Sequence, residues 1–275
     1  MLLDGLPIKQ KGSSAVDEPK TEPLEESHCD VVPGDEEFRA SRATWRQEMA
    51  EDAGLRSEAV ALQQHAEAHR YTYTWEWLGV PIIRIPDDMV VLQELFWSYR
   101  PQRVVETGIA RGGSMLLDAS LMKLCGEEPA VLGIDWKIFG HTVDALRGHP
   151  LMTGVEMLEV NSVSPEAESA TKAFLEGADR AVLILDSSHT HEHVLGELEL
   201  LAPLLPVGGY VLVADTLIEE FPPGYYDGRP WDRGNNPATA VRDFVRAHQE
   251  FSLSTEWSRR ALLSEFRDGV IRRES

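Results

Sequence analysis

The chain has 275 residues, of which 43% are hydrophobic, enough for one large domain with an appendage. Acidic residues number 46 against 26 basic ones, and the formal charge of −20 repels nucleic-acid phosphates and anionic membrane surfaces. The two cysteines, Cys29 and Cys125, indicate neither a disulfide framework nor a cysteine metal site. No export signal and no apolar run of roughly 18 residues is found. We expect a cytoplasmic protein without a nucleic-acid or membrane partner.

Three segments follow one another along the chain. Residues 1–35 are rich in Pro, Glu, Lys and Ser, a composition typical of a disordered tail. Residues 36–86 are predicted to form a helical cap and an extended arm, with amphipathic helices broken at Gly54 and alternating aromatic residues over 71–86. The cap is a candidate subunit contact, so a homo-oligomer is possible. Residues 87–275 hold the predicted ligand-binding domain.

Strands alternate with helices in this third segment. The predicted strands are mostly continuous apolar runs, as in a parallel sheet that is buried on both faces. This alternation predicts an α/β fold with a doubly wound, Rossmann-like sheet, whose ligands bind where the strands end. A Gly- and Pro-rich loop, a helix and two antiparallel edge strands, at 251–256 and 260–266, are expected to complete the chain. The predicted parallel strands are 103–107, 131–135, 155–160, 181–186 and 209–215, with helices at 114–125, 141–148, 165–177 and 191–202.

A glycine turn, VVETGIARGGS, joins the first of these strands to its helix. Backbone N–H groups at such a turn face a ligand above the strand. A dinucleotide fingerprint needs glycine at the place of Ala110, so NAD is disfavoured. S-adenosylmethionine has no pyrophosphate and needs an acid at the end of the second strand, where Asp135 stands. The alternative is that the glycines serve packing and Asp135 caps a helix. The predicted cofactor-binding residues are Glu106, Gly108, Gly112, Gly113, Ser114, Asp135 and Asp186.

Asp186 and His189 follow the fourth strand, and Asp215 ends the fifth. Histidine is suited to take a proton from a hydroxyl near neutral pH, so His189 is the predicted catalytic base. Asp186 and Asp215 offer the oxygen ligands that magnesium prefers. Both acids remain open to a simpler reading as caps of a helix or loop. The run HTHEH is one residue too short for the HxHxDH motif of metallohydrolases.

Residues of about 70–273 resemble the cephalosporin hydroxylase family, a branch of class I methyltransferases that includes rhamnosyl O-methyltransferases. The matching pieces are ETGIARGGS, LGIDWK, LDSSHTHEHVLGELELLAPLLPVGGYVLVADT, RPWDRGNNPATAVRDF and FRDGVIRR. The resemblance implies S-adenosylmethionine at the turn, metal at Asp186 and a base at His189. In similar magnesium-dependent sugar O-methyltransferases two adjacent acids end the fifth strand, whereas this chain has Ala214 and Asp215.

The leading hypothesis is an S-adenosylmethionine-dependent O-methyltransferase, assisted by magnesium. Its acceptor would be a hydroxyl of a small sugar-like or natural-product molecule, as in antibiotic biosynthesis. One alternative is an Fe(II)-dependent hydroxylase of a β-lactam-type substrate, with iron on His189, Asp186 and His191. Another is a non-catalytic scaffold that retains the fold.

Overall fold

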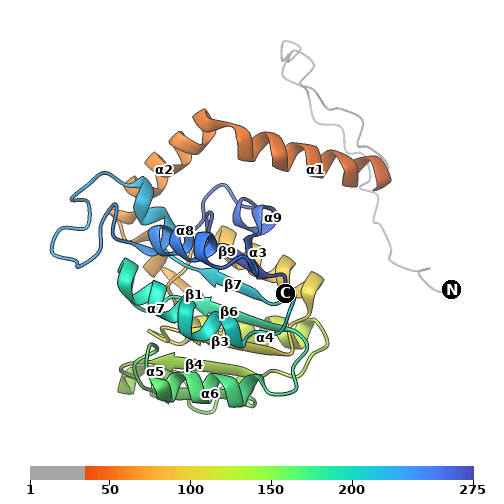
Figure 1. Cartoon of the computed structure of the whole chain (residues 1–275), viewed down its shortest axis with the longest axis vertical. Coiled ribbons are helices and arrows are strands. Elements are labelled where there is room, and N and C mark those ends of the chain that lie inside the picture. Colours follow the sequence, from red (N-terminus) through yellow and green to blue (C-terminus); the bar gives the residue numbers. More distant parts are fainter. Residues whose placement is uncertain (1–34) are drawn as a thin grey trace, which may run out of the picture. The chain divides into compact units, whose positions relative to one another are not determined.

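The computed structural model describes residues 35–275 (Figure 1). The tail predicted over 1–35 therefore lies outside the described residues, apart from Asp35, where helix α1 (Asp35–Glu51) begins. The contacts divide the chain after Trp45, and the second compact unit, Arg46–Ser275, contains the whole sheet. Along residues 35–275, no helix combines the length and the apolarity needed to cross a membrane.

A seven-stranded sheet in the order β5-β4-β3-β6-β7-β9-β8 forms the centre of this unit (Figure 1). The first five strands in that order are parallel, and β9 and β8 are antiparallel additions at one edge. The predicted α/β, Rossmann-like fold is confirmed. The strands are β3 (Arg103–Thr107), β4 (Val131–Asp135), β5 (Val155–Glu159), β6 (Ala181–Leu185), β7 (Tyr210–Val213), β8 (Phe251–Leu253) and β9 (Val270–Arg273).

The order of the strands places a topological switch point between β3 and β6. From β3 the chain moves outward through β4 to β5, then returns to the other side of β3 and continues through β6 to β7. The crevice above the carboxyl ends of the two strands that flank such a switch is where ligands bind in open α/β sheets. The strand order alone therefore predicts a ligand site above the carboxyl ends of β3 and β6.

Helices cover both faces of the sheet. Apolar side chains of α3 and α4 pack on one face, and those of α6, α7 and α8 pack on the other. The Val, Leu and Ile side chains of the central strands β3, β4, β6 and β7 have almost no exposure, as expected for strands buried on both faces, whereas β5 at the edge is only partly buried. The helices are α3 (Pro86–Tyr99), α4 (Gly113–Leu124), α5 (Gly140–Leu146), α6 (Pro165–Leu175), α7 (His191–Leu201), α8 (Pro237–Ala247) and α9 (Thr255–Ser258).

The segment predicted as a cap and an arm is more structured than expected. Helix α2 (Ala53–Glu67) begins after Asp52, whose carboxylate accepts a hydrogen bond from Leu55 N, so the break precedes Gly54. The arm is a 3₁₀ turn, η1 (Tyr71–Tyr73), followed by the antiparallel hairpin β1 (Trp75–Trp77) and β2 (Val80–Ile82). Residues 78 and 79 both have positive φ, 51° and 85°, which suits a two-residue hairpin turn.

The prediction of a strand at 260–266 is wrong. The last strand is β9, which pairs with both β7 and β8. The backbone around residue 265 bonds to other partners in place of a neighbouring strand. Glu265 N donates to Asp88, and Glu265 O accepts from Thr216.

Candidate functional site

The glycine turn lies directly against the end of β6. Gly108 has φ +91°, and a Cβ atom there would lie 2.0 Å from the carbonyl oxygen of Asp186. Gly112 has φ +87° and is the N-cap of α4, while a Cβ on Gly113 would lie 2.4 Å from the carbonyl oxygen of Pro81. Only glycine fits these places, so the glycines bring the backbone of the turn close to its neighbours on both sides.

Asp135, at the end of β4, hydrogen-bonds the backbone of the glycine turn. Its Oδ2 accepts hydrogen bonds from Ile109 N at 2.8 Å and from Ala110 N at 3.3 Å. Oδ1 accepts from Lys137 N at 3.0 Å. The carboxylate thus bonds the turn itself in this structure, a contact that the sequence analysis did not foresee.

Asp135 also lines a cavity of about 520 Å³, the largest of three above the strand ends, which we call the Asp135 cavity. The exposed aromatic side chains of Trp136 and Phe139 border it, together with Gly108 and Asp186. Flat aromatic faces beside a few polar groups are typical of a site for a planar heterocycle.

Glu106 lies deeper than predicted. It is fully buried and lines none of these three cavities, and within residues 35–275 neither carboxylate oxygen has a hydrogen-bond partner. Burial raises the pKa of Glu106 to about 7, against the lowering effect of the Arg84 guanidinium. The direct contact between Glu106 and a cofactor stays a prediction.

Arg84 is a residue that the sequence analysis missed. Its side chain is 1% exposed, and its guanidinium lies within 4 Å of three carboxylates: Asp186 at 3.2 Å, Glu106 at 3.6 Å and Glu265 at 3.7 Å. An arginine after a short apolar segment gives no local signal of such a role. Arg84 is the basic centre of a buried acidic region between the turn and the end of β6.

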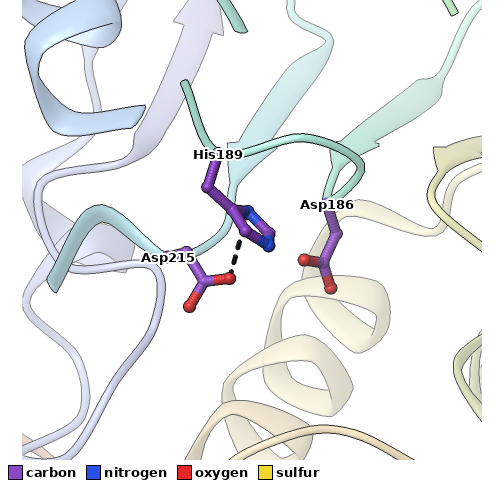
Figure 2. A group of neighbouring side chains, drawn as sticks. All are labelled: Asp186, His189 and Asp215. Carbon is purple, nitrogen blue, oxygen red and sulfur yellow. Dashed lines mark ion pairs between the residues drawn. The ribbon is translucent and has the colours of Figure 1, made fainter. Parts of the chain in front are cut away.

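Asp186, His189 and Asp215 gather at one point, from the ends of β6 and β7 (Figure 2). Each offers one ligand atom, and these atoms all lie within 4.8 Å of one another. His189 Nδ1 lies 3.2 Å from Asp215 Oδ2, so Asp215, and not Asp186, is the direct partner of the imidazole. Asp215 has φ 56°, a left-handed conformation that is uncommon for a residue with a side chain.

The electrostatics of this cluster favour a cation. Burial raises the pKa of Asp186 to about 6, the Arg84 guanidinium opposes the rise, and Asp215 adds to it. Two carboxylates that face one another across an imidazole are hard oxygen donors of the kind that magnesium binds. The residues present therefore fit a magnesium ion. Within residues 35–275, this is the one group of three or more such side chains close enough to hold a metal.

His191 lies outside the cluster. Its Nδ1 is 2.8 Å from Thr239 Oγ1, and its backbone N donates to Asn235. An iron site on His189, Asp186 and His191 would need His191 to leave both contacts. The structure does not bring that trio together.

Two smaller cavities lie at the cluster, and one of them also reaches the turn. One, of about 180 Å³, is lined by the turn and by the cluster, including Gly108 and Ser114. The other, of about 150 Å³, is lined by all three cluster residues, and we call it the His189 cavity. Asp186 lines all three cavities, and Gly108 lines two. The turn and the imidazole therefore open onto the same space.

The His189 cavity is walled by segments that are far apart in the sequence. Gln63 and Glu67 come from α2, Tyr73 from η1, and Tyr226 and Trp231 from the loop after β7. The Trp231 ring meets the His189 ring edge to face, at 4.7 Å between centroids. The sequence predicted a Gly- and Pro-rich loop here, but nothing in the sequence indicated Gln63.

The end of the Trp231 loop, at Gly234 and Asn236, is held by hydrogen bonds to Glu219, which lies just after β7. This residue lies in the 3₁₀ helix η4 (Thr216–Glu220), and its carboxylate accepts hydrogen bonds from Gly234 N, Asn236 Nδ2 and Arg242 Nη2 at 2.8, 2.7 and 2.9 Å. Tyr225 Oη donates to Gln64 O at 3.0 Å and so ties the loop to α2. The loop is fixed at these points although it has little regular structure.

Known proteins resemble this chain in sequence and in fold. The rhamnosyl O-methyltransferase of Mycobacterium leprae (strain TN) is 31% identical over 163 residues, 57% of this chain and 69% of the relative. That of Mycobacterium tuberculosis (strain ATCC 25618 / H37Rv) is 32% identical over 181 residues, 62% of this chain and 71% of the relative.

Two solved structures share the fold. One is described as "CmcI-N160 apo-structure", with a TM-score of 0.54 and 19% identity over 74% of this chain and 77% of that one. The other, "cmcI-D160 Mg-SAM", has a TM-score of 0.52 and 19% identity over 74% and 78%. The family model described as Rhamnosyl O-methyltransferase/CmcI matches residues 69–274. This chain therefore belongs to the rhamnosyl O-methyltransferase/CmcI family, whose members are S-adenosylmethionine-dependent O-methyltransferases.

Proposed function

We propose that this chain binds S-adenosylmethionine across the switch point and methylates a hydroxyl of a sugar-like ring in the His189 cavity. The nucleoside would occupy the Asp135 cavity and the amino-acid end would lie at the turn of Gly108 to Ser114. The observation that carries the proposal is the shared space: Gly108 and His189 line one cavity, and Asp186 lines that cavity and both of its neighbours. A methyl donor at the turn is thus within reach of an acceptor beside the imidazole.

The proton of the acceptor hydroxyl would pass to His189. Because Nδ1 faces the Asp215 carboxylate, the tautomer with hydrogen on Nδ1 leaves Nε2 free to accept that proton. The oxygen gains a bond to the methyl carbon as the bond from that carbon to sulfur breaks, so the sulfonium becomes a neutral thioether. Asp215 orients the ring and stabilises the imidazolium that forms. General-base help of this kind contributes roughly 10²–10⁴ in rate.

Asp186 and Asp215 would hold the magnesium ion, with His189 adjacent. The ion, when bound, lowers the pKa of a coordinated hydroxyl and fixes the position of its oxygen. The chain itself contributes the carboxylates, and Arg84 holds the Asp186 carboxylate at 3.2 Å.

The walls of the His189 cavity favour a neutral ring as the acceptor. Its volume of about 150 Å³ matches one six-membered ring, since a cavity of roughly this size holds benzene. Tyr73, Tyr226 and Trp231 offer aromatic faces, which stack on the C–H faces of sugars. Among the described residues that line this cavity, Arg229 is the one Lys or Arg, and several lining side chains are acidic. An anionic acceptor is therefore disfavoured. The rhamnosyl group in the name of the family points the same way.

Binding and transfer together test the proposal. Calorimetry should show that the full chain binds S-adenosylhomocysteine, and labelled methyl should appear on a rhamnosyl glycoside when S-adenosylmethionine and Mg²⁺ are supplied. Absence of binding would leave the scaffold hypothesis standing. Iron-dependent oxygen uptake without a methylated product would support the hydroxylase instead.

A further inference from the structure

Glu265 is a further carboxylate beside the metal-binding cluster, on a segment that no sequence motif marked. It is 7% exposed and lines the His189 cavity together with Asp186, His189 and Asp215. No hydrogen bond to its carboxylate is found among the described residues. Its cationic neighbour is Arg84, whose Nη1 lies 3.7 Å from Oε2, too far for a hydrogen bond.

The backbone of Glu265 is clamped next to Asp215. Thr216, which directly follows Asp215, donates to Glu265 O from its backbone N at 3.1 Å and from Oγ1 at 2.9 Å. On the other side, Asp88 accepts from Glu265 N at 2.7 Å and from Ser264 Oγ at 2.6 Å. These four bonds fix the segment while leaving the carboxylate free of hydrogen bonds at the cavity wall.

Arg84 links Glu265 to the cluster. The same guanidinium contacts Asp186 through Nη2 and Glu265 through Nη1. Arg84 also pairs with Glu106, so this one cation neutralises only part of the charge of three carboxylates. A buried carboxylate without hydrogen bonds is costly, and the ion pair with Arg84 offsets only part of that cost.

We propose that Glu265 is an outer-shell carboxylate of the metal site, which accepts hydrogen bonds from water on a divalent cation held by Asp186 and Asp215. This inference rests on the proposed function. Magnesium in proteins keeps several of its waters, because it gives them up reluctantly. An acceptor fixed beside the ion orients such water and strengthens binding, as outer-shell partners do in other metal sites.

Titration with Mn²⁺, followed by its paramagnetic resonance signal, measures the site without reference to activity. The full chain is used with saturating S-adenosylhomocysteine. We expect Glu265→Gln to weaken Mn²⁺ binding roughly 10–100-fold, the range seen when outer-shell partners are lost. The matched control is Glu256→Gln on α9, which removes the same charge from an exposed side chain and should bind Mn²⁺ like the unchanged protein. Affinity for S-adenosylhomocysteine without metal should be equal in all three proteins.

Several outcomes would overturn the inference. If Glu265→Gln binds Mn²⁺ as tightly as the unchanged protein while Asp215→Asn loses it, the proposed metal site is kept and Glu265 is reduced to a partner of Arg84. Equal weakening by Glu256→Gln would mean that overall charge is responsible. An unchanged protein that binds S-adenosylhomocysteine but no Mn²⁺ would refute the metal site and this inference, not methyl transfer. If Glu265→Gln does not fold, Glu265→Asp serves, with weaker binding expected from its shorter side chain.

Discussion

The two ends of the proposed site, the donor end at the glycine turn and the acceptor end around His189, are built in different ways. At the donor end, one strand, one turn and the end of the neighbouring strand supply the groups, and glycine backbone makes the closest approaches. At the acceptor end, side chains from α2, η1, two strand ends and a long loop meet around His189. The turn glycines tolerate almost no substitution because their backbone lies against its neighbours, whereas the side chains that line the His189 cavity can be replaced one at a time. We therefore expect variants at the two ends to fail in different measurements.

The largest effect is expected from Gly108→Ala. The added Cβ would lie 2.0 Å from the Asp186 carbonyl oxygen, so either the turn or the end of β6 has to move. We expect binding of S-adenosylhomocysteine to be lost in calorimetry. Strain and overpacking together should lower the free energy of unfolding by about 2–5 kcal/mol, measured in urea.

Gly126→Ala is the matched control for this change. Gly126 has a similar φ of +82°, but a Cβ there meets nothing within 4 Å. It should cost about 1–2 kcal/mol from backbone strain alone and leave cofactor binding intact. Equal losses in both variants would show that the close approach to Asp186 is unimportant.

His189→Ala should separate the two ends most cleanly. We expect methyl transfer to fall by roughly 10²–10⁴, because the general base is lost, while S-adenosylhomocysteine binds as before. His191→Ala should methylate at nearly the normal rate, since His191 bonds Thr239 outside the cluster. If both variants lost the same activity, a two-histidine site would regain support.

Two tryptophans, one at each cavity, test whether acceptor binding and cofactor binding can be weakened separately. Trp231→Ala should raise the KM for the acceptor roughly tenfold, as expected for an aromatic contact of about 1 kcal/mol or more, without changing cofactor affinity. Trp136→Ala should do the reverse, because Trp136 borders the Asp135 cavity. Loss of one aromatic stacking partner costs about 1–3 kcal/mol per base. Steady-state kinetics and calorimetry on both variants would reveal any exchange of these roles.

A further prediction concerns stability and pH and does not involve activity. Burial raises the pKa of Asp88 in the folded protein to about 7 from 3.8, so the folded state binds the proton more tightly than the unfolded chain. This contribution to stability is present below the unfolded pKa and is lost as the pH rises through about 4 to 7.

Asp88→Asn should therefore flatten the dependence of the free energy of unfolding on pH in this window. Urea denaturation at about pH 5 and at about pH 8 measures the change. Asp87→Asn, a half-buried neighbour in the first turn of α3, serves as the control. An unchanged slope in Asp88→Asn would mean that this carboxyl does not titrate in the expected range.

The sequence predicted β3, β4 and the glycine turn well because their signals are local. Buried parallel strands are continuous apolar runs, and β3 and β4 begin and end where those runs do. The glycines and Asp135 follow directly from the strand ends, so the turn was identified without knowledge of the rest. The cluster of Asp186, His189 and Asp215 was also predicted, because parallel strands bring their carboxyl ends together.

The remaining residues were not predictable in the same way. Arg84 and Glu265 meet across a large separation in sequence, and only the fold shows that they are buried against each other. The pairing of His189 with Asp215 depends on the left-handed backbone of Asp215, which residue type alone does not indicate. The strand wrongly expected at 260–266 failed for a related reason, since its backbone serves Thr216 and Asp88 in place of a sheet partner.

The anchoring of the loop by Glu219 has a consequence for how such enzymes diversify. Both borders of the segment are secured, one by the strand that delivers Asp215 and the other by the bonds of Glu219 to Gly234 and Asn236. Apart from Tyr225, which bonds α2, substitutions between these borders would alter the wall of the His189 cavity without moving the strand ends that carry Asp186 and Asp215. We therefore expect changes in this loop to alter which acceptor is bound before they alter the reaction itself.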